Sequence, residues 1–257
     1  MTQVQDFTLQ DFRGRAALVT GAASGIGAAC AKALAARGAG KLVLVDVDSA
    51  GMDALDLPGE VHRVVGSVAD EALWQDIAPS LAGLDHAVVN AGIGSGGVIS
   101  EISLAEWRRV MDVNLDGAFL TLATALRAME GRRGSVVVVS STTGIKPVPG
   151  IGPYGVAKAA VAHMARIAAA ENAKSGIRVN AIAPGGVDTA IWESGADFKA
   201  SVAEIGREAT IARMAKTTPL GRFASSEEMA DSILYLLSDA AANITGHVMV
   251  SDGGFTL

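Results

Sequence analysis

Short apolar runs alternate along the chain with longer segments in which apolar residues recur every three or four positions. Most short runs are continuous in Val, Ile, Leu and Ala, which is typical of strands buried on both faces of a parallel sheet. They predict seven strands, at 16–20, 41–46, 61–65, 85–90, 135–141, 178–182 and 247–251. The longer segments predict five helices, at 26–37, 70–81, 104–130, 154–175 and 226–238.

Signals at the helix ends support these boundaries. Ser103 followed by Glu106 predicts a capping box, and Gly176 directly follows the fourth predicted helix. The stretch 47–60 is too short for a full crossover helix, so we expect only an irregular turn or two there. Repeated strand–helix alternation predicts an α/β fold, a doubly wound parallel sheet of about seven strands with helices on both faces. With no repeat or linker in the sequence, we expect a single domain over 1–257.

One segment departs from this alternation. Residues 185–221 form a long excursion between the sixth strand and the last helix. Its large apolar residues are spaced as on short amphipathic helices: Trp192, Phe198, Val202 and Ile205. Because open α/β sheets bind ligands beyond the carboxyl ends of their strands, an insertion at this place predicts a lid over a substrate.

Composition and charge narrow the class of protein. The net charge of −6 disfavours a nucleic-acid partner. No apolar stretch approaches the ~18 residues of a membrane span, and the polar N-terminus lacks a signal-peptide pattern, so we expect a cytoplasmic protein. The single cysteine, Cys30, excludes an internal disulfide and is expected to be a small buried residue. The histidines show no ligand spacing, so no metal is expected.

The first predicted strand runs into a glycine-rich loop, Thr20-Gly21-Ala22-Ala23-Ser24-Gly25-Ile26-Gly27, and then into a helix. Glycines there let the backbone turn tightly and bring amide groups and a helix N-terminus against a pyrophosphate. Asp46 ends the second strand, where a carboxylate can bind the adenosine ribose and repel a 2′-phosphate. Since neither Ser24 nor the residues after Asp46 are basic, the sequence predicts NAD and disfavours NADP.

Tyr154 and Lys158 lie four positions apart at the start of a predicted helix, so they share one face. A free tyrosine has a pKa near 10, which is too high for an efficient base at neutral pH. A neighbouring ammonium and a cationic nicotinamide favour the phenolate and lower that pKa. The pair is therefore a candidate acid–base site, although such pairs are also common on exposed helices.

The chain as a whole resembles the short-chain dehydrogenase/reductase family, in the branch with a Tyr-x3-Lys site. The matching elements, in order, are Thr20 to Gly27, Asn90-Ala91-Gly92, Asn114, Ser141, Tyr154 with Lys158, Pro184-Gly185, and Asp252-Gly253-Gly254. The resemblance implies a Rossmann fold and an NAD-dependent oxidoreductase that interconverts a secondary alcohol and a ketone by hydride transfer, with Tyr154 as general acid and base.

The same resemblance implies a catalytic set of Asn114, Ser141, Tyr154 and Lys158. Ser141 would orient the substrate oxygen, and Lys158 would hold the nicotinamide ribose. The backbone of Asn114 would hold a water that links the lysine to solvent. Ser140 is the rival for the serine role, but Ser141 has the family's spacing from the tyrosine.

The residues expected to bind the cofactor lie mostly where strands end. Besides Tyr154 and Lys158, they are Gly21, Ser24, Gly25, Ile26, Gly27, Asp46, Ser67, Val68, Asn90, Ala91, Gly92, Pro184, Gly185, Val187 and Thr189. The amide and carbonyl of Val187 are expected to clamp the carboxamide. The family usually has Asp-Val where this chain has Ser67-Val68, so we expect a weaker contact with the adenine amino group.

The residues expected to face the substrate are small or apolar, and none is a lysine or arginine. They are Gly94, Ser95, Ser141, Val148, Ile151, Tyr154, Gly186, Ile191 and Trp192. Such a site fits a neutral, fairly hydrophobic alcohol or ketone, and the small residues at 94–97 suggest room for a bulky one.

The alanine-rich segment 154–175 is apolar around most of its circumference, which predicts burial against a second subunit. In the family this helix and the preceding one pair across a two-fold axis, so we expect a homotetramer, with a dimer as the alternative. Two other functions stay open. Asp46 argues against a 3-oxoacyl-(acyl-carrier-protein) reductase, which usually draws on NADPH, and the intact catalytic set argues against a non-catalytic NAD-binding protein.

Overall fold

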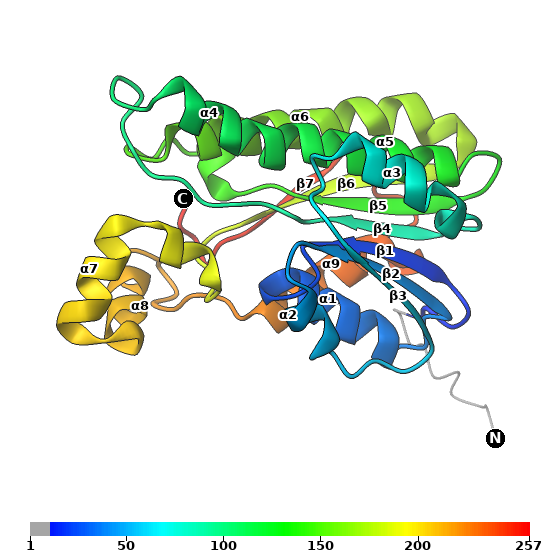
Figure 1. The fold of residues 1–257 in the computed structure, drawn as a ribbon, viewed down its shortest axis with the longest axis horizontal. Helices are drawn as coiled ribbons and strands as arrows, with labels where there is room; N and C mark the ends of the chain where they lie inside the picture. The colour runs from blue at the N-terminus through cyan, green and yellow to red at the C-terminus, as the bar shows by residue number, and fades with distance from the viewer. Residues whose placement is uncertain (1–10) are drawn as a thin grey trace.

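The computed structural model describes residues 11–257, and their seven strands form one parallel sheet in the order β3-β2-β1-β4-β5-β6-β7 (Figure 1). The strands are β1 (Ala16–Thr20), β2 (Lys41–Asp46), β3 (Glu60–Val65), β4 (His86–Val89), β5 (Gly134–Val139), β6 (Ile177–Pro184) and β7 (Val248–Ser251). The doubly wound α/β fold is therefore confirmed, with strand ends within two residues of those predicted.

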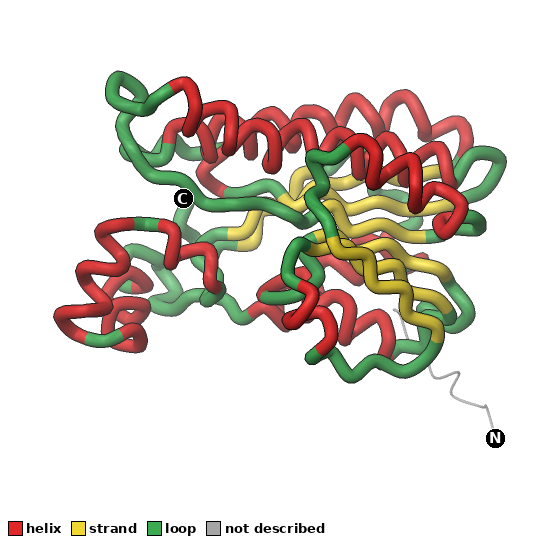
Figure 2. The backbone as a smooth tube through the Cα atoms, in the orientation of Figure 1, coloured by secondary structure: helices red, strands yellow, loops and turns green. Residues whose placement is uncertain are grey.

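Helices cover both faces of this sheet (Figures 1 and 2). One face carries α1 (Gly25–Ala36), α2 (Ser49–Asp53) and α9 (Ser226–Leu237), and α1 packs against α9. The other carries α3 (Glu71–Ile77), α4 (Leu104–Met111), α5 (Gly117–Ala128) and α6 (Gly152–Asn172). Two further helices, α7 (Ala196–Ile205) and α8 (Arg207–Ala215), extend beyond the strands on the side of the C-terminus. No helix within residues 11–257 has the length and apolar character needed to cross a bilayer.

Two apolar layers, one on each face, explain why the strands read as continuous apolar runs. In β1, Leu18 packs into the layer under α5 and α6, and Val19 into the layer under α1 and α9. The pleat sends successive side chains to opposite faces, so both must be apolar when both faces are covered. Cys30 is fully buried in the α1 layer, as predicted.

The helix predicted over 104–130 is not one regular helix. A π-helical turn, Asp112–Asp116, interrupts it and separates α4 from α5. A π turn inserts a residue without breaking the apolar stripe, so periodicity alone does not reveal it. The stretch 47–60 holds only the five-residue α2, in line with the expectation of short turns.

Of the two predicted helix-end signals, the one at Gly176 is confirmed and the capping box at Ser103 only in part. Gly176 has the left-handed φ of +76° expected of a residue that ends a helix. The capping box at α4 forms only in half. The Ser103 hydroxyl accepts from the Glu106 amide at 3.1 Å, but the Glu106 carboxylate binds Arg109 and Ser95 and does not return to the helix start.

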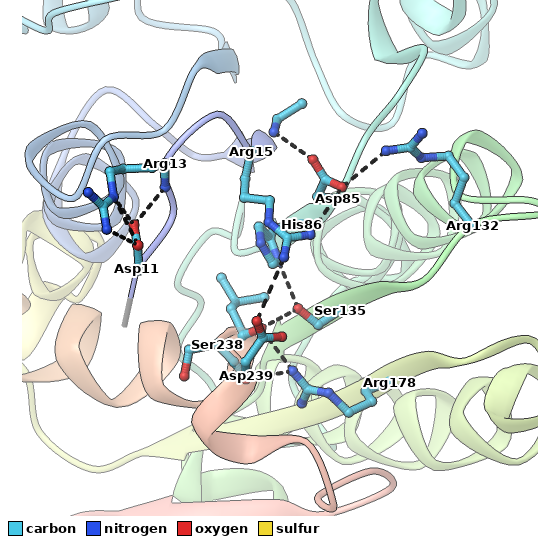
Figure 3. A network of polar contacts seen from close by, with 12 residues as sticks. Asp11, Arg13, Arg15, Asp85, His86, Arg132, Ser135, Arg178, Ser238 and Asp239 are labelled. Atoms are coloured by element: carbon cyan, nitrogen blue, oxygen red, sulfur yellow. Dashed lines mark hydrogen bonds and ion pairs between the residues drawn. The ribbon is translucent and has the colours of Figure 1, made fainter. Parts of the chain in front are cut away.

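A polar network closes the amino-terminal edge of the sheet (Figure 3). Asp85, just before β4, accepts from the Ala16 amide at 2.9 Å and pairs with Arg132 at 3.2 Å. Beside it, His86 Nδ1 lies 2.8 Å from the hydroxyl of Ser135. With this edge sealed by side chains, the opposite, carboxyl-terminal edge is the one left for a ligand.

Candidate functional site

The carboxyl ends of β1 and β4 diverge at the point where the strand order reverses. Asn90, just after β4, bridges them: its side-chain amide donates to the carbonyls of Thr20 at 3.0 Å and Gly21 at 3.3 Å. The Thr20 hydroxyl in turn accepts from the amides of Asn90 and Ala91. The predicted Asn90-Ala91-Gly92 element is thus fastened to the glycine-rich loop across a crevice between two strands.

Three glycines in that loop stand where a side chain would not fit or the backbone disfavours one. Gly21 and Gly25 have φ of +64° and +53°, a region that other residues rarely adopt. A Cβ on Gly21 would lie 2.7 Å from Asn90 Nδ2, and one on Gly27 would clash with the Gly21 carbonyl. Ser24 precedes α1 without capping it, so within the described chain the N–H groups of this helix N-terminus stay open to an anion.

Asp46 lies beside the same loop. One carboxylate oxygen accepts from the Ala23 amide at 2.9 Å and the other from the Asp48 amide at 3.0 Å. These bonds hold the carboxylate at the end of β2, and its remaining lone pairs can accept further hydrogen bonds. Val47, next to it, is exposed.

At the neighbouring strand end, the Ser67 hydroxyl accepts from the Ala69 amide at 3.2 Å, which leaves its own proton free to be donated. Val68 is buried and packs where a Cβ on Gly117 would stand. Its side chain is therefore part of the core, and its carbonyl accepts from the indole N–H of Trp74 at 2.8 Å, so its backbone N–H is the group that a ligand could meet.

Tyr154 and Lys158 lie one turn apart at the start of α6, with Lys158 Nζ 5.6 Å from the centroid of the tyrosine ring. Lys158 is only 4% exposed, and its ammonium donates to the Val139 carbonyl at 2.8 Å. Burial lowers the pKa of Lys158 to about 8. Burial also raises the pKa of Tyr154 to about 12, and a hydrogen bond with the Ser141 hydroxyl opposes that rise.

The two serines after β5 have different surroundings. Ser140 donates its hydroxyl to the Lys158 carbonyl at 2.7 Å and so ties α6 to the strand. The Ser141 hydroxyl accepts from the amide and the hydroxyl of Thr143, at 3.2 and 3.0 Å, and lies toward Tyr154. The proton of Ser141 is used by neither bond to Thr143, which favours Ser141 over Ser140 for contact with a substrate.

Asn114 lies inside the π-helical turn and is 1% exposed. Its side chain donates to the Ile93 carbonyl at 2.9 Å and accepts from the Ile93 amide at 3.0 Å. A Cβ on Gly92 would lie 2.6 Å from Asn114 Oδ1 and 3.4 Å from Lys158 Nζ. Asn114 and Lys158 therefore come together around a glycine, and π turns of this kind are frequent at functional sites.

The segment after β6 forms the far wall of the crevice. Pro184 ends the strand, and a Cβ on Gly185 would lie 2.7 Å from Asp252 Cα, so the Asp252-Gly253-Gly254 turn packs directly on Gly185. At the other end of the segment, the Thr189 methyl lies 3.1 Å from a Cβ position on Gly25. This segment thus extends from the end of the sheet to the glycine-rich loop.

The Val187 carbonyl accepts a hydrogen bond from the indole N–H of Trp192 at 2.8 Å, which uses one of its two lone pairs. The clamp expected from its amide and carbonyl stays a prediction. The indole also stacks on Phe223, with ring centroids 5.4 Å apart and planes 18° apart. Trp192 is therefore held within the protein and is not simply a wall facing a substrate.

Two residues expected to face the substrate make contacts within the protein. The Ser95 hydroxyl donates to Glu106 at 2.8 Å, because the carboxylate beside it, paired with Arg109, is a strong acceptor. Gly94 makes room for the lid, since a Cβ there would clash with Ser194 and lie 3.0 Å from the Ile191 carbonyl. Their contact with a substrate stays a prediction.

Val148 and Ile151 are half-buried on the loop that leads into α6, and Ile151 forms a β-bridge with Gly97. Gly186 lies under the Phe223 ring, where a Cβ would clash. Phe223 was not among the predicted site residues, and no local signal marks it, because its contacts with Trp192 and Gly186 depend on how the excursion returns to the sheet.

Arg207 also escaped prediction. At the start of α8, it pairs with Asp188 at 2.6 Å and with Glu193 at 3.6 Å, so it fastens the two-helix part of the excursion to its base. In the sequence, the glycine directly before it, Gly206, was the available signal of a break between helices. In the structure Gly206 has a φ of +80°. No group of three or more His, Cys, Asp or Glu side chains in residues 11–257 is arranged to hold a metal ion.

The sequence is similar along nearly its whole length to known proteins. A family model described as Enoyl-(Acyl carrier protein) reductase matches residues 21–256. A cis-4-hydroxycyclohexanecarboxylate dehydrogenase of Sinomonas cyclohexanicum is 41% identical over 95% of this chain and 98% of its own. A 2,5-dichloro-2,5-cyclohexadiene-1,4-diol dehydrogenase of Sphingobium indicum is 36% identical, over 96% and 99%. A 3-oxoacyl-(acyl-carrier-protein) reductase of Thermotoga maritima is also 36% identical, over 95% and 98%.

Solved structures show the same extent of similarity. The crystal structure of levodione reductase superposes with a TM-score of 0.85 and 34% identity over 95% of this chain and 98% of that one. A structure from Agrobacterium tumefaciens with bound NADP gives a TM-score of 0.82 and 33% identity, over 97% and 99%. The similarity therefore includes both the sheet and the excursion beyond it.

Proposed function

The chain belongs to the short-chain dehydrogenase/reductase family, and on that premise we propose that it interconverts a secondary alcohol and a ketone with NAD(H). The observation that carries the proposal is the meeting of Ser141, Tyr154 and Lys158 at the carboxyl edge of the sheet. The Lys158 ammonium is buried 5.6 Å from the tyrosine ring, and the Ser141 hydroxyl faces the phenol.

The crevice has the properties that a dinucleotide requires. Gly21, Gly25 and Gly27 let the loop turn tightly and expose backbone N–H groups at a helix N-terminus, which suits a pyrophosphate. Asp46 would accept from the adenosine ribose hydroxyls, and with Val47 and Asp48 after it no cation is at hand for a 2′-phosphate, so NAD is proposed over NADP. When bound, the nicotinamide accepts the hydride of the alcohol, or supplies one to the ketone.

The proposed proton chemistry starts at Tyr154. For alcohol oxidation its phenolate takes the hydroxyl proton, and Ser141 donates its unused proton to the same oxygen. With a pKa of about 12 in the free protein, the phenol needs help to ionise, and the nearby Lys158 ammonium favours the phenolate. We propose that the proton then leaves through Lys158 and a water held by the backbone of Asn114.

For the substrate we propose a neutral, fairly hydrophobic ring alcohol. Two of the relatives are named for six-membered ring alcohols, one a cyclohexanecarboxylate and the other a neutral cyclohexadiene diol. The half-buried Val148 and Ile151 offer an apolar surface on one side, and Ile191, at the start of the lid 185–221, offers one on the other. No lysine or arginine is among these residues, which supports the neutral ring over the carboxylate.

We further propose that the chain is a single domain that assembles as a cytoplasmic homotetramer. Three large apolar side chains on the outer side of α5 and α6 support the assembly. They are Phe119, Val156 and Ile167, which are 53%, 45% and 48% exposed. Burying such side chains against a second copy would be favourable.

An acyl-carrier-protein-linked ketoacyl reductase is the second candidate. It is favoured by the Thermotoga maritima relative. The name of the matching family model shares the acyl carrier protein with this candidate but refers to reduction of a C=C bond and not of a ketone. Asp46 speaks against it, because a carboxylate in that place opposes the 2′-phosphate of NADPH. The two candidates differ in both cofactor and substrate, so a single assay separates them.

The test follows NADH and NADPH absorbance with cyclohexanol, a 4-hydroxycyclohexanecarboxylate, aryl ketones and a 3-oxoacyl thioester. We expect turnover of the neutral ring alcohol with NAD, and a loss of at least 100-fold in Tyr154→Phe. Preference for the thioester with NADPH would establish the second candidate. Turnover that survived Tyr154→Phe undiminished would overturn the proposed chemistry.

A further inference from the structure

The first turn of the lid is fastened to the segment after β6 by one side chain. This turn is the 3₁₀ helix Ala190–Ser194, and its Trp192 donates its indole N–H to the Val187 carbonyl at 2.8 Å. The ring stacks on Phe223 on one side, and the ring of Phe198 lies 6.5 Å away at 31°. These aromatic contacts fix the direction in which the N–H points.

The backbone around Val187 is held from the other side by Ala224. The Ala224 amide donates to the Gly186 carbonyl at 2.9 Å, and the Asp188 amide donates to the Ala224 carbonyl at 3.2 Å. In extended backbone the N–H and C=O of one residue point the same way, opposite to those of its neighbours. Both polar groups of Val187 therefore point away from Ala224, toward the side where Trp192 lies.

Only one of these two groups is taken. The carbonyl of Val187 accepts from Trp192, while its N–H makes no hydrogen bond within residues 11–257. Because the peptide unit that holds this carbonyl also holds the Asp188 amide, it is gripped at both ends, by Trp192 and by Ala224. The free Val187 N–H belongs to the preceding peptide unit, whose Gly186 carbonyl accepts from Ala224, so the units on both sides of Val187 are fixed. An unpaired backbone N–H between two fixed peptide units is suited to a ligand carbonyl oxygen.

The same turn is seated on the opposite wall of the crevice. A Cβ on Gly94 would clash with Ser194 and lie 3.0 Å from the Ile191 carbonyl, so the turn rests on the loop after β4. Thr189, just before the turn, contacts the glycine-rich loop at Gly25. Trp192 thus lies where the lid, the segment after β6 and the cofactor crevice converge.

We propose that Trp192 is a positioning residue for the nicotinamide end of the cofactor. Its indole N–H fixes the Val187 carbonyl, and with the hold of Ala224 on the preceding peptide unit it sets the backbone angles of Val187 so that the free N–H points at the carboxamide oxygen. This bond couples the position of the lid to cofactor binding. The inference rests on the proposed function. It differs from a substrate-wall role, because the indole N–H and a ring face are already engaged by Val187 and Phe223.

The test compares two ligands that differ only at the nicotinamide. Calorimetry gives Kd for NADH and for ADP-ribose, which lacks the nicotinamide, in wild type, in Trp192→Phe and in the matched control Trp107→Phe on α4. If wild type binds NADPH more tightly than NADH, the same comparison is made with NADPH and 2′-phospho-ADP-ribose in place of NADH and ADP-ribose. We expect Trp192→Phe to weaken the dinucleotide about threefold to tenfold and to leave ADP-ribose within about twofold. The control should change neither.

A second replacement guards against loss of packing. β-(3-Benzothienyl)alanine at position 192 keeps both rings and replaces only the N–H with sulfur, so it should reproduce the selective loss. Unchanged dinucleotide binding in both variants, or equal weakening of both ligands, would overturn the inference. Wild-type protein that binds neither dinucleotide would instead overturn the proposed function, and the inference with it.

Discussion

The hydroxyl of Ser140 donates to the backbone carbonyl of Lys158 at 2.7 Å, so this serine is committed to holding α6 against β5. Its neighbour Ser141 lies toward Tyr154 with its proton unused by Thr143. Replacing each with alanine should show that only Ser141 acts in the reaction. The Lys158 carbonyl lies inside α6 and keeps its helical hydrogen bond, so Ser140→Ala removes only a second bond to it. That loss should lower the free energy of unfolding by about 0.5–1.5 kcal/mol and leave the activity near that of wild type.

Ser141→Ala should instead lower kcat/KM by about 10²–10³, because a donor to the reacting oxygen is lost. Its free energy of unfolding should also fall, by about 0.5–2 kcal/mol, because the bonds from the Thr143 amide and hydroxyl are lost. Steady-state kinetics and urea unfolding on both variants check the pair, and the activity is what distinguishes them. If Ser140→Ala lost as much activity as Ser141→Ala, the assignment of the catalytic role to Ser141 alone would be wrong.

We expect the buried Lys158 ammonium to support activity but to lower the stability of the fold, by an amount that depends on pH. Burial lowers its pKa from 10.5 to about 8, which corresponds to roughly 3 kcal/mol of cost for holding the charge inside. Below pH 8 the Lys158 side chain is protonated in both the folded and the unfolded chain, so burial of its charge lowers the free energy of unfolding by the full amount. Between pH 8 and 10.5 the folded chain loses the proton first, so wild-type stability rises with pH over that window.

Lys158→Met should therefore be almost inactive yet more stable than wild type at pH 7, by about 1–3 kcal/mol once the lost bond to Val139 is counted. The gap should narrow from pH 8 upward. Thermal unfolding between pH 6 and 10 measures it, with the exposed Lys174→Met as the matched control. If the difference in free energy of unfolding between Lys158→Met and wild type stayed constant with pH, burial of the ammonium would not be what destabilises the wild type.

Asp46 predicts the cofactor preference and its reversal. Asp46→Ser combined with Val47→Arg removes the carboxylate and supplies a cation for a 2′-phosphate. We expect kcat/KM with NAD to fall about 10–100-fold and that with NADP to rise. Asp48→Ser is the control, since the Asp48 carboxylate accepts from the Gly51 amide and caps α2. The proposed role of Asp46 would be wrong if the double variant kept the wild-type preference for NAD.

The strand pattern was predictable because both faces of the sheet are buried, which forces continuous apolar runs such as Leu42 to Val45. The strand ends were predictable for the same reason, and they bring Asp46, Asn90 and Ser141 to one edge. The contacts made by the excursion 185–221 could not be predicted from the sequence. That Trp192 binds the Val187 carbonyl, and that the lid is seated on Gly94, depends on tertiary packing, which leaves no periodic trace in the sequence.

The outer side of α5 and α6 predicts an assembly interface. Phe119→Asp on α5 and Ile167→Asp on α6 would each place a carboxylate in the buried contact that the homotetramer requires. Light scattering coupled to gel filtration should show dimers or monomers in place of tetramers. Val65→Asp on the edge strand β3, where Val65 is 58% exposed, should leave the assembly unchanged. A monomeric wild type would contradict the proposed assembly.

His86 predicts how the protein responds to acid. Burial lowers its pKa from 6.5 to about 4. The Ser135 hydroxyl gives its proton to the Leu237 carbonyl at 2.6 Å, so it must accept from His86 Nδ1, which fixes the neutral tautomer (Figure 3). Between pH 6.5 and 4 the unfolded chain binds a proton that the folded chain does not. The free energy of unfolding therefore decreases as the pH is lowered from 6.5 to 4, by up to about 3 kcal/mol.

His86→Gln should remove this dependence, because its amide can still donate to Ser135 but does not titrate. The difference in free energy of unfolding between variant and wild type should therefore shift in favour of the variant as pH drops from 6.5 to 4. His247→Gln, at an exposed position just before β7, is the control and should follow wild type. Parallel curves for His86→Gln and wild type would show that His86 gains its proton in the folded chain as readily as in the unfolded one.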